Sequence, residues 1–169
     1  MAIGTARLAH LGLPNSELYV GLAFGEHRVS ATLIADAALL FPGDGAEDPE
    51  ALTDGPPRTL VVLDGTWSQA RKLLLANPAL ATLPRIGLTP TRPSQYKIRR
   101  EPAAHCLSTV EAVVQTLGRL ERDDTRFLPM LRAFEYLVAT QIACADRASP
   151  YWHRRRAARR EMLEAQANR

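Results

Sequence analysis

The run from Leu60 to Arg71 constrains the fold more than any other stretch, because a short apolar run changes directly into a helical pattern. Four apolar residues, Leu60 to Leu63, are typical of a strand covered on both faces, as in a parallel sheet. Asp64 and a glycine follow, and Thr66 with Gln69 has the spacing of a capping box that opens a helix. The pattern therefore places Asp64 at the carboxyl end of a strand, where ligands bind in open α/β sheets.

The same residues have a plainer explanation. An ordinary strand-to-helix turn also uses Asp-Gly for its backbone conformation. A carboxylate that merely precedes a helix is stabilised by the helix dipole by ~0.3–1 kcal/mol. The spacing around Asp64 does not separate the two interpretations, and a second stretch of sequence is needed.

That second stretch runs from Arg92 to Pro102 and is followed by Leu107-Ser108-Thr109-Val110-Glu111-Ala112. Together with Asp64-Gly65-Thr66-Trp67 it resembles the DTW-domain family, which is named for a D-x-T-W motif. The segment Leu39-Leu40-Phe41-Pro42-Gly43 is also similar, and the resemblance covers roughly Thr5 to Glu111. Many members carry a cysteine-rich segment before this part. The resemblance therefore implies a member that lacks that segment, either a short one or an N-terminally clipped one.

Alternating strands and helices predict an α/β fold. The expected helices are Thr5–Leu13, Trp67–Ala76, Ser108–Leu120 and an amphipathic helix over Thr125–Ala145, and the expected strands are Leu18–Gly21, Ala37–Phe41, Thr59–Leu63 as the central strand, and Arg85–Leu88. The resemblance implies a SPOUT-like, mostly parallel sheet flanked by helices, with a C-terminal trefoil knot. We expect residues 1–150 to form this catalytic domain and residues 151–169 a basic helix or tail.

The resemblance implies a tRNA-uridine aminocarboxypropyltransferase. Such enzymes use S-adenosylmethionine and transfer its 3-amino-3-carboxypropyl group to N3 of a uridine. N3 is a poor nucleophile until it loses its proton, so a carboxylate can accept that proton or stabilise the positive charge of the donor. Asp64 is the predicted catalytic residue for either task.

The predicted binding residues for S-adenosylmethionine come from both motifs. They are Leu63, Asp64, Thr66, Trp67, Leu88, Leu107, Ser108 and Thr109. Thr66 is expected to act first as a helix cap, and Trp67 as a core residue more than a ligand contact. Ser108 and Glu111 repeat the capping-box spacing, which is a sufficient explanation for Glu111.

Basic residues are concentrated in two segments of a chain whose net charge is +3. Residues 85–100 hold five basic residues and no acid, and residues 151–169 hold six arginines and two acids, so the remainder is acidic. This distribution favours a polyanionic partner, here tRNA, although a solvated surface would look similar. The predicted RNA-binding residues are Arg92, Tyr96, Lys97, Arg99, Arg100, Arg154, Arg155 and Arg156.

Other features narrow the class of protein. The two cysteines and four histidines show no metal-ligand spacing, so we expect no metal. No apolar run is long enough to cross a bilayer and no secretory signal is present, so a cytoplasmic protein is expected. A monomer is slightly favoured. Two alternatives stay open: an RNA methyltransferase of SPOUT type and a non-catalytic RNA-binding protein.

Overall fold

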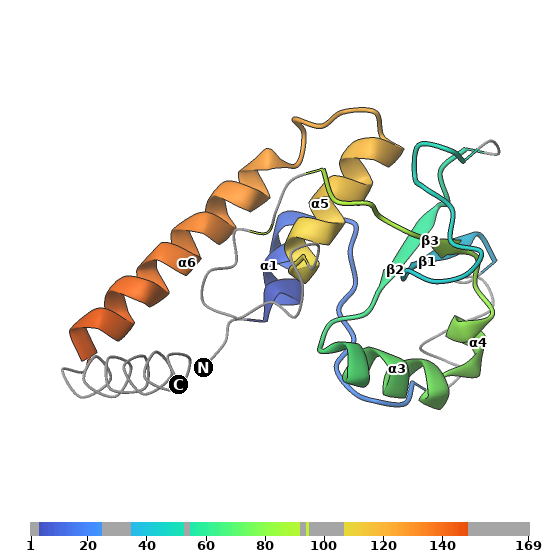
Figure 1. Cartoon of the computed structure of the whole chain (residues 1–169), viewed down its shortest axis with the longest axis horizontal. Coiled ribbons are helices and arrows are strands. Elements are labelled where there is room, and N and C mark those ends of the chain that lie inside the picture. Colours follow the sequence, from blue (N-terminus) through green and yellow to red (C-terminus); the bar gives the residue numbers. More distant parts are fainter. Residues whose placement is uncertain (1–3, 25–34, 53–54, 92–93, 95–106, 149–169) are drawn as a thin grey trace, which may run out of the picture.

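The computed structural model describes residues 4–24, 35–52, 55–91, 94 and 107–148. Its sheet has three parallel strands, β1 (Ala37–Leu40), β2 (Thr59–Val62) and β3 (Arg85–Ile86), in the order β2-β1-β3 (Figure 1). Ala37 pairs with Thr59 on one side of β1, and Leu39 pairs with Arg85 on the other. The predicted parallel α/β arrangement is confirmed. The prediction that Thr59–Leu63 is the central strand is wrong, because β1 takes that place and β2 lies at an edge.

The helices of the described residues are α1 (Thr5–Gly12), α3 (Trp67–Ala76), α4 (Pro78–Ala81), α5 (Thr109–Leu120) and α6 (Leu128–Ala148). Figure 1 shows α3 and α4 on one side of the sheet and α1, α5 and α6 on the other. The four predicted helices are confirmed, with α6 beginning three residues later than expected. None of the described helices is long and apolar enough to span a membrane.

Two apolar clusters hold these layers together. The helical cluster joins α1, α5 and α6 through Ala9, Val110, Val113, Val114, Phe127, Met130, Phe134 and Val138. The sheet cluster joins β1 to α3, α4 and the following turn through Ala37, Leu39, Leu74, Leu80 and Leu83. Because successive strand residues face opposite sides, Val62 packs on the helical cluster while Val61 and Leu63 pack on the sheet cluster. The end of β2 therefore lies between the two clusters, and Asp64 follows two residues later.

Two predicted strands differ from the structure. Residues 18–21 form no strand, and instead the chain after α1 runs as an extended loop beside α3 (Figure 1). The strand predicted at Arg85–Leu88 keeps only Arg85–Ile86 as β3. Beyond β3 the Gly87 N–H donates to the carbonyl of Glu47 at 2.9 Å. A hydrogen bond to a loop therefore takes the place of strand pairing at this edge of the sheet.

Candidate active site

Asp64 lies two residues after the end of β2 and three before the first residue of α3. Its carboxylate is exposed. Gly65 beside it has φ of 140°, a backbone conformation that favours glycine, and a Cβ there would lie 3.1 Å from Cβ of Gln69. The glycine thus allows the tight turn that leaves Asp64 at the strand end.

A capping box begins α3, as the sequence predicts. The Thr66 N–H donates to Oε1 of Gln69 at 2.7 Å, and the Gln69 N–H donates to Oγ1 of Thr66 at 3.3 Å. Both residues are exposed. The Thr66 hydroxyl therefore serves the helix first, and its predicted contact with a ligand stays a prediction.

The two sequence motifs meet at Asp64. The Thr109 hydroxyl, at the start of α5, donates to Oδ1 of Asp64 at 2.5 Å. These two residues are 45 positions apart in the sequence. The contact brings the strand end of β2 and the N-terminus of α5 together, and one carboxylate oxygen is held by the hydroxyl.

Glu111 organises the start of α5 from inside the protein. Its side chain is buried, and Oε2 accepts hydrogen bonds from the Ser108 N–H at 2.8 Å and the Ser108 hydroxyl at 2.6 Å. The Ser94 hydroxyl donates to the same oxygen at 2.8 Å. Glu111 therefore joins the loop before α5 to the cap of α5, a role wider than the capping box predicted from its spacing.

Two further polar side chains continue from Glu111 along α5 at intervals of four residues, so all three lie on one face of the helix. We call Glu111, Gln115 and Arg119 the α5 stripe. Gln115 Oε1 accepts from the Thr91 N–H at 3.1 Å and from the Thr91 hydroxyl at 3.3 Å. Later residues of the helix bind earlier residues of the loop, since Glu111 binds Ser94, Gln115 binds Thr91 and Arg119 binds Thr89. The loop therefore runs antiparallel to α5.

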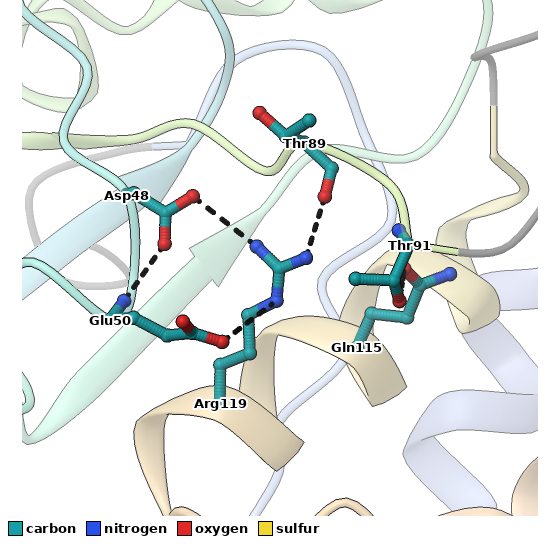
Figure 2. Close-up of polar contacts among 6 residues, drawn as sticks. All are labelled: Asp48, Glu50, Thr89, Thr91, Gln115 and Arg119. Carbon is teal, nitrogen blue, oxygen red and sulfur yellow. Dashed lines mark hydrogen bonds and ion pairs between the residues drawn. The ribbon is translucent and has the colours of Figure 1, made fainter.

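Arg119 fixes the other end of this loop (Figure 2). Its Nη2 donates to the carbonyl of Thr89 at 2.6 Å, while Nη1 lies 3.3 Å from Oδ2 of Asp48 and Nε lies 3.6 Å from Oε1 of Glu50. Only 9% of the Arg119 side chain is exposed. The guanidinium thus ties α5 to two loops that are far apart in the sequence.

Trp67 is not a core residue. Its side chain is 42% exposed and meets the ring of Phe41 edge-on, with ring centroids 5.8 Å apart. The Arg85 guanidinium lies over the Phe41 ring, 5.7 Å from its centroid. The expectation of core packing is wrong because Trp67 occupies the first turn of α3, on its solvent side, where its ring stays accessible.

A cavity of about 370 Å³ opens beside Asp64. Its described lining consists of Gly21, Leu22, Asp64, Gly65, Gln69, Lys72 and Leu73. Only Asp64 in this set was predicted as a site residue. Leu22 and Lys72 were not predicted to lie beside Asp64, because the loop after α1 and α3 beyond its first turn carry neither family motif.

The remaining predicted residues divide into two groups. Leu63 packs on the sheet cluster, Leu88 and Leu107 are half-buried, and Ser108 is buried. The predicted RNA-binding residues lie outside the described residues: Arg92, Tyr96, Lys97, Arg99, Arg100, Arg154, Arg155 and Arg156. Within the described ranges no group of three or more His, Cys, Asp or Glu side chains could hold a metal ion.

Comparison with known proteins accounts for the two motifs that meet at Asp64. The DTW domain model matches residues 2–142. The chain belongs to the DTW-domain family. No solved structure matches it.

Curated relatives of this DTW-domain chain carry the name tRNA-uridine aminocarboxypropyltransferase 2. The protein of Drosophila melanogaster is 38% identical over 128 residues, which is 71% of this chain and 51% of the relative. The protein of Mus musculus is 33% identical over 130 residues, which is 73% of this chain and 44% of the relative. The chain thus spans about half the length of these relatives.

Proposed function

We propose that this chain transfers the 3-amino-3-carboxypropyl group of S-adenosylmethionine to N3 of a uridine in tRNA. The observation that carries the proposal is the exposed Asp64 carboxylate at the strand end, held on one oxygen by Thr109 from the second family motif. The names of the curated relatives support the same reaction and substrate.

The residues around Asp64 suit such a donor. Its amino and sulfonium groups are positive and complement the Asp64 carboxylate, while its own carboxylate suits the free N–H groups of the first turn of α5. Trp67 lies three residues after Asp64, and the half-buried Leu107 lies two residues before Thr109, so both offer apolar surface near this carboxylate. We infer that the half-buried Leu88 adds to this surface. We infer that Leu63, Thr66 and Ser108 complete this site by fixing the backbone.

The donor supplies an electrophilic carbon bonded to a positively charged sulfur. N3 of uridine forms the new bond to this carbon as the carbon–sulfur bond breaks and its electron pair passes to sulfur. Asp64 either accepts the N3 proton or stabilises the positive charge before it is lost. Thr109 holds one oxygen of Asp64, and no described residue bonds the other oxygen, so that it can face the substrates.

We further infer a SPOUT-like fold with a C-terminal trefoil knot, within a catalytic domain of residues 1–150 that acts as a cytoplasmic monomer. The basic tail, residues 151–169, and the arginine-rich segment ending at Arg100 are proposed to bind tRNA phosphates. The concentration of basic residues in these two segments supports this. A chain ending at residue 150 should still bind S-adenosylmethionine while its tRNA affinity falls.

The experiment that tests the reaction is mass spectrometry of tRNA incubated with S-adenosylmethionine and the protein. We expect a mass gain that matches the aminocarboxypropyl group. An Asp64→Asn variant should lower turnover by ~10²-fold or more, because it keeps the shape but removes the charge. Asp36→Asn, the same change at an exposed position before β1, is the matched control. A methyl mass, or full turnover by the Asp64 variant, would contradict the proposal.

A further inference from the structure

The cavity beside Asp64 is built from two parts of the chain that one buried side chain holds together. Asn77, only 5% exposed, donates from Nδ2 to the carbonyls of Leu22 at 2.8 Å and Leu73 at 2.7 Å. Its Oδ1 accepts from the Phe24 N–H at 2.8 Å. Because Leu22 and Leu73 both line the cavity, a single amide sets the separation of its two apolar walls.

The loop on one side of the cavity exposes apolar surface. Val20 is 76% exposed and Leu22 is 56% exposed, and the rings of Tyr19 and Phe24 pack together with centroids 6.1 Å apart. Large apolar side chains kept in solvent next to polar groups are typical of binding surfaces. The loop is therefore fixed in place by Asn77 while its apolar side chains remain available to a ligand.

The opposite wall of the cavity carries one negatively and one positively charged side chain. Asp64 lies at one side, and Lys72 projects from the second turn of α3. Among the described residues Lys72 forms no salt bridge, so its ammonium group is available to an anion. A volume of about 370 Å³ falls in the range of small-molecule sites and has room for one nucleotide.

Asp64 can be approached from two directions. Thr109 and the start of α5 contact Oδ1 from one direction. Of the predicted donor-binding residues that the structure describes, Leu88, Leu107, Ser108 and Thr109 are absent from the described lining of the cavity. The α5 side and the cavity side of Asp64 are thus separate, as a transfer between two substrates requires.

We propose that this cavity is the subsite for the target nucleotide, an inference that rests on the proposed function. The pyrimidine base lies against Leu22 and Leu73 with its N3 edge toward Asp64, and a phosphate of the same strand binds Lys72. A base turned out of its stack needs apolar surface for its faces and polar groups for its edge. Asn77 acts as a positioning residue, because it holds Leu22 and Leu73 apart.

Photocrosslinking tests the subsite without relying on turnover. The probe is a tRNA transcript containing 5-bromouridine, irradiated with the full chain and mapped by mass spectrometry. We expect crosslinks in residues 18–24. Leu22→Trp should remove them by filling the cavity, whereas Leu75→Trp, the same change at an 82% exposed position of α3 outside the cavity, should keep them.

Affinities separate this subsite from the donor site. Leu22→Trp should lower kcat/KM for tRNA by about tenfold or more, while the Kd of S-adenosylmethionine stays within about twofold of wild type. Lys72→Ala, which removes no buried group, should reduce the slope of log affinity against log salt by about one, and Arg71→Ala beside it serves as the control. The Lys72 variant keeps the test valid if Leu22→Trp does not fold.

Two results would overturn the proposal. Crosslinks that lie only outside residues 18–24 and survive in Leu22→Trp place the base elsewhere. A Kd for S-adenosylmethionine raised about tenfold by Leu22→Trp assigns the cavity to the donor. If the wild-type chain transfers no aminocarboxypropyl group, the proposed reaction fails, and the crosslink position alone then decides whether the cavity holds a nucleotide.

Discussion

The starts of α3 and α5 use the same local motif in opposite surroundings. In α3 the capping box pairs Thr66 with a neutral, exposed Gln69. In α5 the residue at the matching position is Glu111, a buried carboxylate whose Oε2 also accepts a hydrogen bond from Ser94 in another loop. The spacing of each box is local, but burial decides how much of the fold depends on it.

The difference has a physical basis in what replaces a lost hydrogen bond. At an exposed cap, water takes over the freed donor and the net cost is small. At a buried cap the donors stay without a partner, and each costs ~1–3 kcal/mol. We therefore expect α5 to act as the rigid side of the site and α3 as the side that tolerates change.

The largest effect should follow the loss of the Glu111 carboxylate. Glu111→Ala removes the buried acceptor that both Ser108 donors and the Ser94 hydroxyl share, so the free energy of unfolding should fall by about 3 kcal/mol. Gln69→Ala, the matched change in α3, should lower it by only ~0.5–1 kcal/mol. Urea denaturation of the three proteins measures both values. Equal losses would show that burial does not distinguish the two helix starts.

Arg119 extends the same comparison to the far end of the α5 stripe. Arg119→Met keeps the aliphatic stem but removes the donor to Thr89, so we expect a loss of ~1–2 kcal/mol. The ion pairs add little, because the side chains of Asp48 and Glu50 are 40% and 71% exposed.

The loop around Thr89 and Thr91, which Arg119 anchors, should also become less protected from exchange in this variant. In Arg119→Met, hydrogen exchange at the Thr91 amide should become faster, since the loop then keeps only its Gln115 and Glu111 anchors. Arg132→Met, at an exposed position of α6, should change neither the exchange rate nor the unfolding free energy. Unchanged exchange in Arg119→Met would mean that Gln115 and Glu111 alone place the loop.

The sequence predicts features that depend on neighbours along the chain. The helix at Trp67–Ala76, the strands at Ala37 and Thr59 and both capping boxes agree with the structure, because spacing of three or four residues decides each of them. Asn77, the residue that follows α3, belongs to neither sequence motif. Two of its three hydrogen bonds reach a loop more than 50 residues away, and no periodic pattern in the sequence indicates such a partner.

The candidate site shows the same limit. Asp64 and Thr109 were each predicted as site residues from their motifs, but the hydrogen bond between them depends on how β2 and α5 pack. Arg119 belongs to no recognisable sequence motif, and one of its partners, Asp48, is 71 residues away in the sequence. Strand order was missed for a related reason, because apolar runs identify strands without telling which one lies at the edge.

The turn that precedes α6 separates the effect of charge from the effect of burial. Asp123, like Glu111, accepts three hydrogen bonds on one carboxylate oxygen: from the Thr125 hydroxyl at 2.7 Å, the Thr125 N–H at 3.0 Å and the Arg126 N–H at 3.1 Å. Unlike Glu111 it is exposed. These bonds, with that of the Thr125 hydroxyl the largest cause, lower the pKa of Asp123 below its usual value.

The smallest effect is therefore expected at Thr125, and it should depend on pH. Because the folded pKa of Asp123 is depressed, its contribution is present above the unfolded pKa of about 4 and is lost as pH falls through the folded value. Thr125→Val removes the hydroxyl and should raise the Asp123 pKa toward its usual value, measured by carbon NMR titration of the carboxyl group. Thr140→Val, whose hydroxyl bonds the carbonyl of Tyr136, should leave that titration unchanged. The effect on stability should be smaller than for Gln69→Ala and vanish at low pH, whereas the loss in Glu111→Ala includes buried donors that water does not reach. If Thr125→Val destabilised the chain as much as Glu111→Ala, the number of hydrogen bonds on a carboxylate, and not its burial, would set the difference between helix starts.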